Sequence, residues 1–195
     1  MKNRIKSIFL FCLPLMAWQL APADYIPFRN ASFEGKPKQS AAPADWNWQS
    51  KGSTADIMPG AWGVQCTPKA GKTCLGLVTR EDGTVEDIGQ QLDKPLKGGI
   101  CYKFSIHLAH VEKYAGYNMP VRLRVWGGNG HKSQLLAASG LVNHKEWRQY
   151  NFQFVPDSDL NTIIFEAYYA PGVTFRYKGN ILLDECSPIE RCDRA

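Results

Sequence analysis

Outside its first residues, the sequence has little excess charge of either sign. The chain has 195 residues with 23 Lys and Arg against 18 Asp and Glu, a formal charge of +5. Lys2, Arg4 and Lys6 lie in an opening segment that contains no acid, so the rest of the chain carries about +2. Nucleic-acid and anionic-membrane partners require clustered excess charge, and this balance argues against both.

The sequence also lacks a sustained helical period and an apolar run long enough to span a bilayer, which takes about 20 residues. The run from Ile8 to Ala17 has about ten residues, follows a basic segment and precedes the small residues 21–23. This layout is typical of a secretory signal peptide. We therefore expect a signal peptide at residues 1–23, one domain at 24–195, no transmembrane segment, and export to the periplasm, the cell surface or the extracellular space.

The motifs of common catalytic sites are missing. The nucleophile motif Gly-x-Ser-x-Gly is absent. His107 and His110 are three residues apart on a predicted strand, so they face opposite sides, and the adjacent acids Glu86 and Asp87 diverge in the same way. For glycoside hydrolysis Glu166 is the only candidate carboxyl, without an identifiable partner. We therefore expect a binding protein and not an enzyme, with a hydrolase as the least favoured alternative.

Five cysteines follow the predicted signal peptide, and export favours disulfides. Cys66 and Cys74 flank a short, turn-rich loop, so we predict that they form a disulfide. Cys186 has two possible partners, Cys192 across a short loop or Cys101 on a neighbouring strand, and one cysteine is left over in either case. Zinc is not indicated, because no Cys-x-x-Cys spacing repeats.

The dominant signal in the sequence is the alternation of apolar and polar residues. It predicts strands at 100–108, 120–126, 147–154 and 162–169, with shorter strands at 74–79, 84–91 and 180–186. Glycine- and proline-rich turns separate these segments. About eight short strands in one domain predict an all-β fold, namely a two-sheet antiparallel sandwich of the jelly-roll type.

The same alternation predicts a polar and aromatic outer face. If Leu123, Val125 and Phe165 point into the core, their neighbours along the strands point outward. The residues that we expect to bind ligand there are Trp126, Tyr168, Arg122, Arg124, His107 and Glu166. Aromatic rings can cover the apolar face of a sugar while charged groups bond to its hydroxyls. The alternative is an ordinary solvated face with cross-strand ion pairs such as Arg124–Glu166.

Short motifs near both ends of the chain carry a family resemblance. Asn30-Ala31-Ser32-Phe33-Glu34-Gly35 opens the mature chain and Asn180-Ile181-Leu182-Leu183-Asp184-Glu185 closes it. With Leu-Gly-Leu-Val at 75–78 and Leu-Arg-Val-Trp-Gly-Gly at 123–128, they resemble the galactose-binding-like jelly rolls of carbohydrate-binding modules. The tract between the ends looks like a Bacteroidetes cell-surface version, which is found ahead of OmpA-like domains. The resemblance implies non-catalytic binding of a polysaccharide or glycan.

The resemblance also implies a structural calcium ion that joins the first and last strands. Glu34 and Asp184 match its carboxylate ligands by position, and Glu185 replaces the second Asp of the usual pair. Ca²⁺ takes six to eight oxygen ligands, which suits carboxylates and carbonyls. Without calcium, Glu34 would be an ordinary surface acid and Asp184 would form an ion pair with a nearby Lys or Arg.

For the whole protein, the alternative to carbohydrate binding is an interaction or adhesion module. Its exposed face would then bind a protein of the cell envelope.

Overall fold

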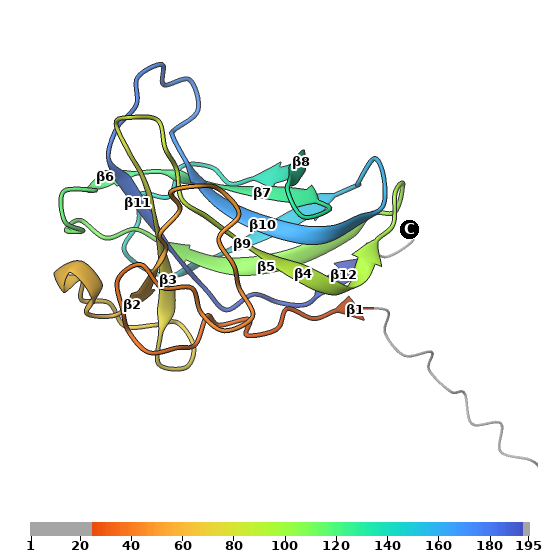
Figure 1. Cartoon of the computed structure of the whole chain (residues 1–195), viewed down its shortest axis with the longest axis horizontal. Helices are drawn as coiled ribbons and strands as arrows, with labels where there is room; N and C mark the ends of the chain where they lie inside the picture. Colours follow the sequence, from red (N-terminus) through yellow and green to blue (C-terminus); the bar gives the residue numbers. More distant parts are fainter. Residues whose placement is uncertain (1–24, 193–195) are drawn as a thin grey trace, which may run out of the picture.

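Strands account for nearly all regular structure in the computed structural model, which describes residues 25–192 (Figure 1). One short 3-10 helix, η1 (Ala61–Gly63), accompanies them. The predicted signal peptide lies outside the described residues. No helix in the described part of the chain is long and apolar enough to cross a membrane.

The first sheet has the strand order β1-β12-β5-β11-β3-β2, with β9 paired to β5 and β6 paired to β11. Its strands are β1 (Tyr25–Ile26), β2 (Asp56–Met58), β3 (Cys74–Thr79), β5 (Tyr102–Ala109), β6 (Met119–Pro120), β9 (Arg148–Phe154), β11 (Gly179–Asp184) and β12 (Ile189–Arg191). β9 covers one edge of β5, and β12 and β11 share its other edge. Strands from both ends of the described chain therefore lie side by side at β1 and β12.

The second sheet has the order β4-β10-β7-β8. Its strands are β4 (Asp87–Leu96), β7 (Arg122–Gly128), β8 (Lys132–Ala138) and β10 (Leu160–Tyr168). An unbroken antiparallel ladder joins β10 to β7, from Thr162 opposite Gly128 to Tyr168 opposite Arg122. Because directly opposite residues point to the same side of a sheet, this ladder fixes which side chains share a face.

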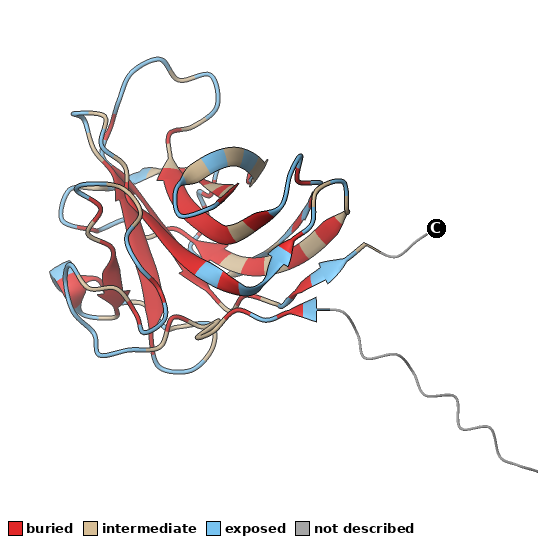
Figure 2. Cartoon of the chain, turned by 45° about the vertical axis from the view of Figure 1, so that its right-hand side comes forward, coloured by how far each residue is buried: buried red, intermediate tan, exposed pale blue. Residues whose placement is uncertain are grey.

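The core lies between the two sheets, and Figure 2 shows buried residues along the strands of both. The residues of β7 and β10 that point into it are Leu123, Val125, Ile163, Phe165 and Ala167, as the alternation predicts. Aromatic rings bridge the sheets, since the ring centroids of Phe104 on β5 and Phe165 on β10 are 5.9 Å apart. The predicted all-β jelly-roll sandwich is confirmed.

A second, smaller apolar cluster covers part of the outer face of the first sheet. It contains Met58, Val78, Tyr114 and Leu182, and segments 59–73 and 110–117 lie over it. Gly76 permits this close packing, because a Cβ there would lie 2.6 Å from the hydroxyl oxygen of Tyr114. Alternation along β11 explains the two clusters, since Leu183 enters the main core and Leu182 enters the outer one.

The disulfide of the structure joins Cys101 to Cys192, with 5.3 Å between the Cα atoms. Both predicted partners of Cys186 are therefore wrong, and Cys186 is a buried free thiol. The physical reason is strand pairing: the residues next to Cys101 and Cys192 pair between β5 and β12, which brings the two cysteines together. The sulfur atoms of Cys66 and Cys74 lie 3.5 Å apart as thiols, so their disulfide stays a prediction.

Candidate functional site

Five of the six predicted ligand-binding residues lie together on the outer face of the second sheet. In the β10–β7 ladder, Trp126 is opposite Ile164, Arg124 is opposite Glu166, and Arg122 is opposite Tyr168. We call the set Arg122, Arg124, Trp126, Lys132, Glu166 and Tyr168 the candidate face; Lys132 is added for the contacts described below. The strand alternation, which places every second residue outward, is the reason that the set shares one surface.

Glu166 is the centre of the candidate face. Only 4% of the residue is exposed. Its carboxylate accepts a 2.9 Å hydrogen bond from the indole Nε1–H of Trp126 and contacts the Lys132 ammonium. The Arg124 guanidinium lies 3.8 Å away. A buried carboxylate is stable only with such partners, so these three side chains are held in place around it.

Lys132 links Glu166 to a second buried acid, Asp87 on β4. The Lys132 Nζ lies 2.6 Å from Asp87 Oδ2, and Asp87 has no exposed surface. Burial acts to lower the pKa of Lys132, but hydrogen bonds to Asp87 and Glu166 outweigh it and raise the pKa above its ordinary value. Asp87 also accepts hydrogen bonds from the backbone N–H groups of Gln49 and Ser50. Neither Lys132 nor Asp87 was among the predicted site residues.

Arg122 and Arg124 both lie against the ring of Tyr168. The guanidinium carbon of Arg124 is 3.1 Å from the ring centroid, and that of Arg122 is 5.7 Å from it. Burial lowers the pKa of Arg122, and the neighbouring Arg124 lowers it further. The Nε atoms of both arginines are buried without a hydrogen-bond partner among residues 25–192. Because both Nε atoms are buried, a ligand on this face would meet the outer parts of the two guanidinium groups.

His107 does not belong to the candidate face, which corrects its predicted place there. It lies on β5, on the outer face of the first sheet, with its Nδ1 3.1 Å from Glu185 Oε2. Alternation shows which residues of a strand share a side, but it does not show which sheet the strand joins. That information comes from the strand pairing, which places β5 and β7 in different sheets.

Glu34 and Asp184, the predicted calcium ligands, both bind the loop 69–73. Asp184 Oδ2 accepts hydrogen bonds from the backbone N–H groups of Lys69 and Ala70, and Glu34 Oε1 accepts one from Lys72. Burial, together with the charge of Glu34, raises the pKa of Asp184 to about 6. The two carboxylates thus contact the same loop, and their partners in the structure are backbone N–H groups. No cluster of three acidic, His or Cys side chains suited to a metal occurs among the described residues.

The candidate face is poorly arranged for acid–base catalysis by a pair of carboxyl groups. Asp87, the acid opposite Glu166, is fully buried and surrounded by donors. Glycoside hydrolysis needs two carboxyl groups that reach the substrate from both sides of the scissile bond. Within the part of the chain that the structure describes, the candidate face offers no such second carboxyl group. Leu135, which is exposed and lies opposite Trp126 on β8, adds apolar surface to it.

No protein-family model and no curated protein matches this chain. Several solved structures have a similar fold. The CBM22-1 xylan-binding domain of Paenibacillus barcinonensis Xyn10C is 17% identical with a TM-score of 0.53, over 85% of this chain and 94% of that domain. The K3 adhesin domain of Lys-gingipain from Porphyromonas gingivalis is 16% identical with a TM-score of 0.52, over 86% of this chain and 98% of that chain.

Enzymes also share this fold. A Stig cyclase, Fisc, from Fischerella sp. TAU is 13% identical with a TM-score of 0.56, over 89% of this chain and 100% of the cyclase. At these identities the likenesses establish the architecture alone, a jelly-roll sandwich that carbohydrate-binding modules use. The ligand depends on the side chains of the candidate face.

Proposed function

We propose that this protein is an exported, non-catalytic carbohydrate-binding protein that binds a polysaccharide or glycan on the candidate face. The observation that carries the proposal is the grouping of Trp126, Tyr168 and two arginines around the buried Glu166. Sugars need both features, since a pyranose has an apolar C–H face and a rim of hydroxyl groups. The similarity to a xylan-binding domain supports the architecture for such a role.

Binding explains this surface better than hydrolysis does. Glu166 contacts Lys132, Arg124 and the indole of Trp126 at once, so its oxygens already have partners. These contacts keep the aromatic and cationic side chains in fixed positions, and a preorganised surface loses less conformational entropy when it binds. Location in the periplasm, at the cell surface or outside the cell remains part of the proposal, because a sugar-binding surface of this kind meets glycans there.

The test is a glycan array followed by calorimetry with the best-binding glycan. We expect Trp126→Ala and Tyr168→Ala each to weaken binding at least about fivefold, because each removes an aromatic contact worth about 1–3 kcal/mol. Tyr25→Ala is the matched control. Tyr25 is 48% exposed on β1 of the first sheet, and its loss should leave affinity unchanged.

Two results would contradict the proposal. One is wild-type protein that binds no glycan on the array. The other is glycan binding that persists unchanged in both face variants. Capture of one specific envelope protein, lost in Trp126→Ala, would instead support an interaction or adhesion module.

We further propose that Glu34 and Asp184 hold a structural calcium ion beside loop 69–73. The support is the proximity of the two carboxylates, whose mutual repulsion contributes to the raised pKa of Asp184. A cation bound between them removes that repulsion. Such an ion would fix the loop and leave sugar binding to the candidate face.

A further inference from the structure

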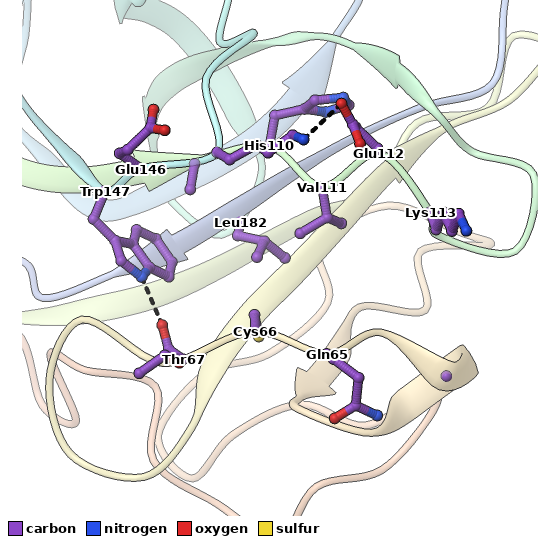
Figure 3. A pocket seen from close by; sticks show the side chains of 13 residues that line it. Gln65, Cys66, Thr67, His110, Val111, Glu112, Lys113, Glu146, Trp147 and Leu182 are labelled. Atoms are coloured by element: carbon purple, nitrogen blue, oxygen red, sulfur yellow. Dashed lines mark hydrogen bonds and ion pairs between the residues drawn. The ribbon is translucent and has the colours of Figure 1, made fainter.

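A pocket of about 540 Å³ opens on the outer face of the first sheet (Figure 3). It lies at the end of β5, above Ala109 and Leu182, between segments 63–67 and 145–147. Leu182 points away from the main core, so the pocket and the candidate face lie on opposite sides of the sandwich. The volume falls within the range of about 300–1,000 Å³ that is usual for small-molecule sites.

The wall of the pocket contains a tryptophan in a fixed position. The indole Nε1–H of Trp147 donates a 2.8 Å hydrogen bond to the backbone oxygen of Thr67, and this bond ties the two sides of the pocket together. Figure 3 shows the Trp147 ring and Val111 on either side of Leu182. The pocket therefore offers an aromatic ring and an apolar floor at a small conformational cost.

The rim of the pocket is polar and its charges balance. Glu112 and Lys145 form a 2.8 Å ion pair that is exposed on both sides, and Glu146 and Lys113 add one charge of each sign. Gln65 supplies an amide that can both donate and accept. Two acids against two lysines favour a neutral ligand, since an ionised one would find no net charge of opposite sign.

We propose that this pocket binds a neutral pyranose ring, as a second sugar site that is independent of the candidate face. A pyranose fits because its C–H face can lie on the Trp147 ring and the apolar floor, while its hydroxyls reach Glu112, Lys145 and Gln65 at the rim. A purely apolar aromatic ligand would leave the rim unused. No residue of this site belongs to the candidate face, so one site can fail without the other.

The test is a titration of ¹⁵N-labelled protein, followed by NMR. The probes are the methyl glycosides of glucose, galactose, xylose and N-acetylglucosamine, with indole as a non-sugar aromatic. We expect at least one glycoside to shift, saturably, the indole N–H of Trp147 and the backbone N–H of Val111. The Trp147 signal is assigned by its loss in Trp147→Ala.

Variants separate this site from the candidate face. Trp147→Ala should weaken the pocket titration at least tenfold, and Glu112→Gln, an exposed rim change that leaves folding intact, should weaken it several-fold. Trp126→Ala, on the opposite face, should not change it. The proposal is overturned if no glycoside shifts the pocket signals, or if indole alone does. Shifts confined to the candidate face would overturn the second site and leave the proposed function standing.

Discussion

At the scale of single residues, the candidate face depends on charges that neutralise one another below the surface. Lys132 stands between Asp87 and Glu166, two acids that are directly opposite in neighbouring strands. Like charges opposite each other destabilise a sheet, and buried ones do so strongly. The ammonium of Lys132 therefore stabilises the fold and at the same time fixes the carboxylate that holds Trp126.

We predict that Lys132→Met lowers the free energy of unfolding by about 3 kcal/mol at pH 7, because it leaves two buried carboxylates without their cation. Although burial acts to lower it, hydrogen bonds to the two acids raise the pKa of Lys132, so its ammonium is charged at pH 7 and its stabilising contribution is fully present there. Urea unfolding at pH 7 measures the loss.

Lys97→Met is the matched control for that prediction. Its ion pair with Asp159 is 2.7 Å long but more than half exposed on both sides, so its loss should cost less than about 1 kcal/mol. Equal losses in the two variants would show that Lys132 does not act through the buried acids.

The sequence predicted this site only in part. Strand alternation places Arg124, Trp126 and Glu166 on one side, and the structure agrees. Lys132 could not be found, because it reaches the face from β8, whose Leu-Leu-Ala-Ala stretch lacks alternation. His107 was misplaced, since alternation carries no information on which of two sheets a strand enters.

At the scale of elements, the loop 69–73 connects distant parts of the chain. Glu34 from the N-terminal segment and Asp184 at the end of β11 both accept its backbone N–H groups. Gly71 leaves room for this arrangement, since a Cβ there would overlap the Glu34 carboxylate.

The sequence predicted most strands, with ends shifted by a few residues. The pairing of Cys101 with Cys192 depends on the order of the strands in the sheet, which the local pattern of residues does not specify.

We predict that calcium stabilises this loop. Excess Ca²⁺ should raise the melting temperature and EDTA should lower it, because a cation between Glu34 and Asp184 offsets their repulsion. Differential scanning calorimetry measures the shift. Glu34→Gln should abolish it, whereas Glu81→Gln, at an exposed acid elsewhere, should keep it. A melting temperature that is the same in Ca²⁺ and EDTA would remove the calcium site.

At the scale of the whole molecule, the two sheets turn different surfaces outward. The second sheet presents the candidate face of arginines and aromatic rings, and the first sheet presents a pocket between segments 63–67 and 145–147. Because the main core separates them, a ligand on one surface leaves the other free. If both proposed sites bind sugar, one chain has two sugar-binding sites on opposite faces.

This arrangement predicts cross-linking, which rests on both proposals. With a polysaccharide whose units bind at both sites, wild-type protein should produce turbidity that rises and then falls as protein exceeds polysaccharide, because excess protein occupies each sugar chain separately. Trp126→Ala and Trp147→Ala should each abolish the turbidity while keeping one binding site, as calorimetry can show. Light scattering measures the effect. Turbidity that survives in either variant would mean that the protein links glycans by self-association and not through two sites of its own.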